Sequence, residues 1–83
     1  MSSNLGTAGT PSFPKHAAAV TKSDVTRFLP SIIWVGGAGD VTVVTSEGET
    51  VLFAGMAAGS VIPVECIGVM STGTAATSMV RIW

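Results

Sequence analysis

Short runs of β-branched residues, separated by glycine-containing turns at intervals of about ten residues, occupy the chain from Ser31 onward. This spacing is typical of a small antiparallel sandwich or barrel, because each run suits a strand and each turn reverses the chain. The sequence therefore predicts an all-β fold, with a compact antiparallel β domain over residues 31–83. The five strands that we expect cover residues 32–36, 41–45, 50–54, 61–70 and 77–83.

Three of the expected turns follow from their residue chemistry. Residues 36–40 (Gly-Gly-Ala-Gly-Asp) supply backbone positions at positive φ, which glycine adopts without steric cost. Residues 46–49 predict a hairpin with Gly48 in the left-handed conformation, and residues 71–74 predict another hairpin. Asp40 is expected to use its carboxylate as an acceptor for backbone N–H groups in its turn.

Residues 51–70 raise the alternative of a membrane helix, since only one of them carries a charge. Two of their glycines even have the spacing that packed membrane helices use. However, three glycines and a proline interrupt the run, and its bulky residues form two β-branched or aromatic segments. We therefore expect strand, turn and strand here. The first residues of the chain show neither the basic nor the apolar region of a signal peptide.

Charge divides the chain into two parts. Residues 1–30 hold three basic residues against one acid, a formal charge of +2, whereas residues 31–83 hold one against four, or −3. We interpret the first part as an extended N-terminal arm and lead-in segment, because its beginning is mostly Ser, Thr, Gly and Asn. Residues 15–20 are expected to be irregular, with one helical turn at most. The candidate contact residues of the arm are Lys15, His16, Lys22 and Arg27.

The scarcity of charge excludes several functions and favours assembly. Charged residues make up 11% of the chain and apolar residues 47%, whereas an ordinary soluble domain has about 25% charged residues. Four basic residues are too few for a nucleic-acid binder, which neutralises phosphates with clustered Lys and Arg. The expected strands are apolar on both faces, and such a sheet must close on itself or be covered by other chains. This pattern favours a homo-oligomer.

The sequence offers no constellation for catalysis. One His and one Cys leave few metal sites and no internal disulfide, so we expect no cofactor and no enzyme activity. Glu47 and Glu49 are more simply solvated turn residues than a carboxylate pair, and the glycines of residues 36–39 precede a strand, unlike a phosphate loop. Cys66 is expected to be a buried small hydrophobe in a protein made in a reducing cytoplasm.

Large side chains are the remaining candidates for function, because aromatic residues dominate both cores and interface centres. We favour a core position for Trp34 and Phe53. For Trp83, a core position and an interface position are equally favoured. Met56, expected in a loop, could be a flexible contact or fold over the end of the domain. The candidate interface residues are Trp34, Met56, Arg81 and Trp83.

The arrangement of these motifs resembles the spike base family of tailed bacteriophages and gene transfer agents. The resemblance rests on residues 34–45, 50–53, 58–64 and 71–77, on Val80 and the terminal Trp83, and on the lead-in residues 22–30. It implies a structural virion protein, made in the bacterial cytoplasm, that lies on the capsid exterior as a head spike base or decoration subunit. The implied partners are the major capsid protein and a spike or fibre protein, with no nucleic acid and no membrane. The arm would then contact the capsid shell or a partner subunit.

Two other functional classes stay open at this point. One is a small β-barrel binding module that recognises a host glycan or other ligand with the loops of residues 36–39 and 55–59, with Trp34 essential. These loops are poor in the polar and aromatic residues that a sugar site requires. The other, more remote, is a membrane-inserted phage protein of the lysis type.

Overall fold

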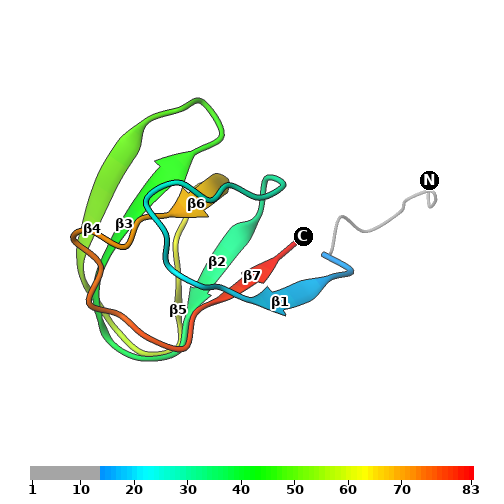
Figure 1. Cartoon of the computed structure of the whole chain (residues 1–83). Coiled ribbons are helices and arrows are strands. Elements are labelled where there is room, and N and C mark those ends of the chain that lie inside the picture. Colours follow the sequence, from blue (N-terminus) through cyan, green and yellow to red (C-terminus); the bar gives the residue numbers. More distant parts are fainter. Residues whose placement is uncertain (1–13) are drawn as a thin grey trace.

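Two antiparallel sheets form the fold of residues 14–83, which are the residues that the computed structural model of the chain describes (Figure 1). One sheet has the strand order β1-β7-β2-β5 and the other has the order β4-β3-β6. Buried residues of both sheets belong to one hydrophobic cluster, so the sheets pack as a sandwich. The strands are β1 (Ala17–Ala19), β2 (Ile32–Val35), β3 (Gly39–Thr45), β4 (Thr50–Met56), β5 (Ser60–Val61), β6 (Cys66–Val69) and β7 (Val80–Ile82).

The all-β prediction is confirmed, but the number of strands is seven instead of five. The strand expected over residues 61–70 is two strands, because the chain changes sheets between them. Val61 in β5 pairs with Trp34, whereas Val69 in β6 pairs with Val43 of the other sheet. Pro63 lies in the connection, where its missing N–H interrupts no ladder.

The additional strand β1 corrects the prediction for residues 15–20. Instead of an irregular segment or a helical turn, β1 pairs antiparallel with β7, with Ala18 opposite Arg81. His16 and Trp83 extend this ladder by exchanging two backbone hydrogen bonds, at 2.7 and 3.0 Å. The division of the chain at residue 30 into an arm and a domain stays a prediction, and residues 1–13 of the arm lie outside the described residues.

The predicted hairpin at Gly48 is confirmed, whereas the turn predicted over residues 36–40 is shorter than expected, because Gly39 and Asp40 already belong to β3. Gly48 has φ of 87° in the hairpin between β3 and β4, as expected. Gly73 also has positive φ, at 83°, but its turn leads from β6 to β7 in the other sheet and is therefore not a hairpin. The prediction for Asp40 is wrong in part: it lies in β3 instead of a turn, and its carboxylate accepts the N–H of Gly55 in β4 at 2.8 Å, where β4 carries an extra residue.

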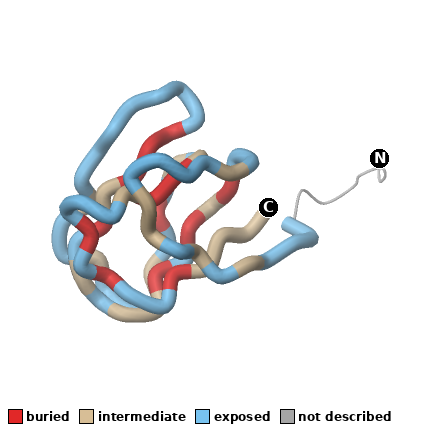
Figure 2. Tube along the Cα trace, viewed as in Figure 1, coloured by how far each residue is buried: buried red, intermediate tan, exposed pale blue. Residues whose placement is uncertain are grey.

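The core lies between the sheets and is built from small β-branched side chains (Figure 2). Ile33 and Val35 of β2 are fully buried and meet Val41 and Val43 of β3. Phe53 packs partly buried against this cluster, as predicted. The core prediction for Trp34 is wrong: its side chain is 39% exposed, because alternation along β2 turns it away from its buried neighbours.

The lead-in segment covers the edge of β6 that β3 leaves unpaired. The N–H groups of Ser23 and Phe28 donate to the carbonyls of Val69 and Ile67, at 2.9 and 2.7 Å. Asp24 accepts two hydrogen bonds from Thr72, from its N–H at 2.9 Å and its hydroxyl at 2.7 Å, and these bonds lower the pKa of the carboxyl. Over residues 14–83, no helix has the length and apolar character needed to cross a membrane.

Cys66 is buried with a free thiol, which confirms its predicted role as a small hydrophobe. Burial, together with the charge of Glu65, raises the pKa of the thiol from 9.0 to about 11. The fold therefore favours the neutral thiol, and this stabilisation is complete below pH 9 and is lost as the pH rises toward about 11. We expect the wild type to lose up to about 3 kcal/mol relative to Cys66→Val over this range.

Urea unfolding of both proteins at a series of pH values measures this difference. Comparison with Cys66→Val cancels the titration of lysines, which the two proteins share. A constant difference between about pH 8 and pH 11 would show that the thiol ionises as easily in the fold as in the unfolded chain.

Candidate assembly surface

The outward side of the first sheet is apolar across all four of its strands. Since Ile33 and Val35 point into the core, Ile32 and Trp34 point outward from β2. Residues directly opposite in the sheet share a face, so the cross-strand partners of Ile32 and Trp34 point outward with them. The resulting surface, named here the apolar face, consists of Ala17, Ala19, Ile32, Trp34, Val61, Val80 and Ile82.

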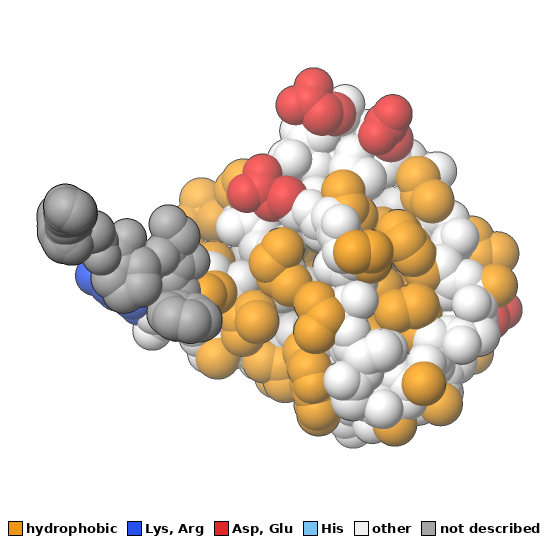
Figure 3. Space-filling view, turned by 180° about the vertical axis from the view of Figure 1, so that it is seen from behind, with side chains coloured by type: hydrophobic (Ala, Val, Ile, Leu, Met, Phe, Trp, Pro, Cys, Tyr) orange, Lys and Arg blue, Asp and Glu red, His pale blue; other side chains and the backbone are white. Residues whose placement is uncertain are grey.

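The apolar face contains no charged side chain, and part of it is strongly exposed. Val61 is 46% exposed and lies beside Trp34 on the neighbouring strand. Figure 3 shows hydrophobic side chains gathered across the middle of the molecule in this view, with acidic side chains toward its upper margin. A contiguous exposed apolar surface of this kind is the usual sign of an interaction site.

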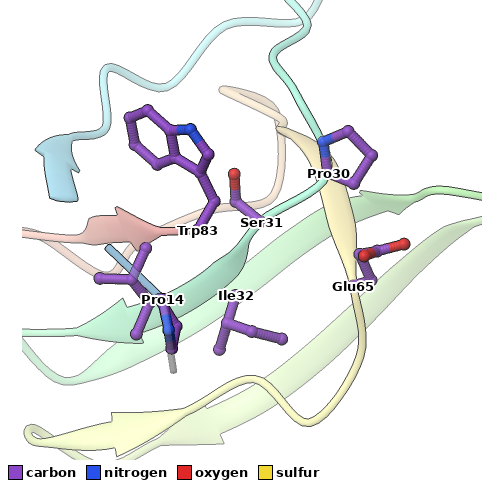
Figure 4. Close-up of a pocket in the computed structure, with 7 residues that line it drawn as sticks. Pro14, Pro30, Ser31, Ile32, Glu65 and Trp83 are labelled. Atoms are coloured by element: carbon purple, nitrogen blue, oxygen red, sulfur yellow. The ribbon is translucent and has the colours of Figure 1, made fainter. Parts of the chain in front are cut away.

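A groove of about 330 Å³ adjoins the apolar face and shares Ile32 and Ile82 with it. Pro14 and Trp83 lie on one side of the groove, and Pro30 and Glu65 lie on the other (Figure 4). Among the described residues that line it, Glu65 is the charged one. The groove therefore extends the apolar face toward the first described residue of the chain and adds a carboxylate at its margin.

Arg81 and Trp83 form a stack that attaches β1 and the lead-in segment to β7. The guanidinium carbon of Arg81 lies 3.7 Å from the ring centroid of Trp83 and 4.9 Å from that of Phe28. The ring of His16 stacks on Trp83 with centroids 5.1 Å apart, and Arg81 donates to the hydroxyl of Ser31 at 3.3 Å. These contacts hold the two side chains half-buried on their own chain. Their role in an interface stays a prediction.

The other candidate residues are distributed over the molecule. Met56 ends β4, so its expected position in a loop is wrong, and it packs partly buried against the core. Lys22 donates to the carbonyl of Thr74 at 3.2 Å, and Arg27 lies over Gly68 and donates to the carbonyl of Thr26 at 2.9 Å.

The four arm residues are therefore not brought together. Lys15 and His16 lie at the end of β7, whereas Lys22 and Arg27 lie along the lead-in segment beside β6 and the link from β6 to β7. Sequence reasoning missed Ile32, Val61, Val80 and Ile82 as members of one surface. The signal for them was that β2 is apolar on both faces and that Val80 and Ile82 alternate with Arg81 in β7, but only the strand pairing joins them.

The loops proposed for glycan recognition do meet, since Gly39 of β3 pairs with Met56 of β4. They lie beyond the end of β2, at Val35, whereas the groove lies at its beginning, at Ile32. Glycan binding by these loops stays a prediction that the groove does not support.

Taken together, these features define a class of protein: a small β-sandwich with an uncharged, partly exposed apolar face. Within residues 14–83, no group of three or more His, Cys, Asp or Glu side chains is arranged to hold a metal ion. Glu47 and Glu49 are exposed at the tip of the β3–β4 hairpin.

Comparison with known structures gives a more particular likeness. The chain is similar to a chain of the structure titled "Capsid of native GTA particle computed with C5 symmetry", where GTA denotes a gene transfer agent. The two are 26% identical with a TM-score of 0.72, and the match covers 84% of this chain and 83% of the other. No protein-family model matches the chain, and the curated proteins contain no significant match.

Proposed function

We propose that the protein is a structural virion protein, a head spike base or decoration subunit on the capsid exterior that binds the capsid shell or anchors a spike or fibre. The observation that carries this proposal is the likeness, in both fold and sequence, to a chain of a GTA capsid particle. The resemblance of the strand and turn motifs to spike base proteins supports the same position. The partners would be the major capsid protein, a spike or fibre protein, and further copies of this chain.

The apolar face supports a role in assembly. An isolated domain of this size gains little stability from its own core, and burial of apolar surface against a neighbour adds about 25 cal/mol per Å². Trp34 would be the main anchor of this contact, with Val61 beside it on the outer strand β5, since aromatic side chains dominate interface energies. The protein would have no catalytic task, and its low charge would be tolerated because neighbours cover its surface.

Trp34→Lys tests this function in particles. The variant replaces an exposed aromatic residue with a cation that would be desolvated in the contact, so we expect its incorporation to fall at least tenfold. The measurement is the amount of this chain per gradient-purified particle, after deletion of the gene and complementation with each variant.

Ser46→Lys is the control, because Ser46 is exposed at the β3–β4 hairpin, outside both the apolar face and the predicted contact arm. It should enter particles at the wild-type level. The proposal fails if purified particles contain no copies of the wild-type chain. Wild-type incorporation of Trp34→Lys would leave the virion role standing but exclude the apolar face as the contact.

A further inference from the structure

Each sheet has at least one edge that no described strand pairs with. In the first sheet the β1 edge is free, as is the edge of the two-residue strand β5, and in the second sheet the free edge belongs to β4. β6, the other edge of the second sheet, is covered by the lead-in segment through the hydrogen bonds of Ser23 and Phe28. Free edges carry unsatisfied N–H and C=O groups and are templates for strand pairing with another chain.

The hydrogen bonds show which residues present these groups. In β1, His16 and Val20 bond toward β7, so by alternation Ala17 and Ala19 direct their N–H and C=O groups outward. In β4, Leu52 lies opposite Thr42, whose carbonyl accepts from Met70 on the β6 side. This pair is therefore not hydrogen-bonded across β3 and β4, and the backbone groups of Leu52 point to the free edge.

Neither edge strand contains a charged residue or a proline, two of the features that prevent association. The seven residues of β4 include no charge and no proline, and Leu52 is 54% exposed. The three residues of β1 are all alanine, which allows another backbone to approach closely. The charges flanking the two edges are opposite: Lys15 precedes β1, whereas Glu47 and Glu49 precede β4.

We propose that the β1 edge of one copy pairs with the β4 edge of the next copy, so that a β-ladder continues from subunit to subunit. The charges favour this mixed contact in the parallel orientation, which places Lys15 of one copy near Glu49 of the next, whereas pairing β1 with β1 or β4 with β4 brings no opposite charges together. Such a head-to-tail contact uses two different surfaces of the chain and therefore produces a ring if it closes and a filament if it does not.

This inference rests on the self-assembly included in the proposed function and names its surfaces. The test co-expresses two full-length variants with different affinity tags, Ala17→Cys and Leu52→Cys, and treats the purified assembly with a short bis-maleimide. Cys66 is buried and its pKa is raised, so it should not react. We expect a cross-link that contains both tags, at least tenfold more abundant than the cross-links from either variant expressed alone.

Three outcomes would overturn the proposal: a monomeric wild type, no cross-link between the two variants, or equal cross-linking of either variant alone, which indicates a two-fold contact. Val25→Cys, paired with Leu52→Cys, controls for random collision, since Val25 is exposed away from both edges.

Leu52→Pro is a second variant, which removes an N–H that β3 does not use. It should remain folded and lose the oligomer; retention of the oligomer by this folded variant would also overturn the proposal. Particle incorporation of Trp34→Lys is a separate readout, so failure of the edge contact and failure of the virion role can be distinguished.

Discussion

Gly39→Val should strongly lower the free energy of unfolding. Gly39 has φ of 153°, which β-branched residues avoid, and a Cβ there would lie 2.7 Å from the backbone nitrogen of Ala76. The two backbone segments cannot easily move apart, because the main-chain carbonyl of Asp40 accepts the N–H groups of Ala75 and Ala76 at 2.8 and 3.1 Å. Backbone strain and overpacking together should cost about 3–5 kcal/mol, against a total stability of about 4–12 kcal/mol for a chain of this length.

Gly48→Val is the matched control for this prediction. Gly48 also has positive φ, at 87°, but a Cβ there would meet no atom within 4 Å. Only the backbone preference is lost, at about 1–2 kcal/mol, so this variant should remain folded. Urea unfolding followed by circular dichroism measures both. Equal losses of stability would show that the close approach at Gly39 contributes nothing beyond its dihedral angle.

Local chemistry explains which turns and strands could be predicted. The turns at Gly48 and Gly73 depend on residues next to one another in the sequence, so their positions follow from it. β1 could not be predicted in this way, because Ala17–Ala19 favours a helix by propensity and becomes a strand only through β7 at the other end of the chain. The break between β5 and β6 likewise depends on which sheet each half joins.

The sequence could predict that the protein has a shared apolar surface, but not which residues form it. Low charge and two-sided apolar strands indicated a shared surface, and Trp34 was a candidate for it. The sequence did not indicate that Trp34 lies beside Val61 and Val80, since these neighbours come from strands that pair only in the fold. Arg81 and Trp83 were chosen for their size, and the stack with His16 shows that they also attach β1 to the sheet.

Ile33→Ala should remove about 3 kcal/mol of stability, the second large effect that we expect. Ile33 is fully buried at the centre of the core, and deletion of its side-chain carbons would leave a cavity between the two sheets. Ile32→Ala makes the same chemical change one residue earlier in β2, on the outward side. Because Ile32 is only partly buried, we expect it to cost about 1 kcal/mol or less.

Comparison of the two isoleucine variants also separates folding from assembly. Ile32→Ala removes apolar surface from the apolar face and should reduce incorporation into particles while the free protein stays folded. At a temperature where Ile33→Ala is still folded, that variant should be incorporated normally, because its change is hidden from any partner. Denaturant midpoints and the chain content of particles supply the two measurements. If Ile32→Ala lost as much stability as Ile33→Ala, the outward side of β2 would be part of the core and the apolar face would not be free for a partner.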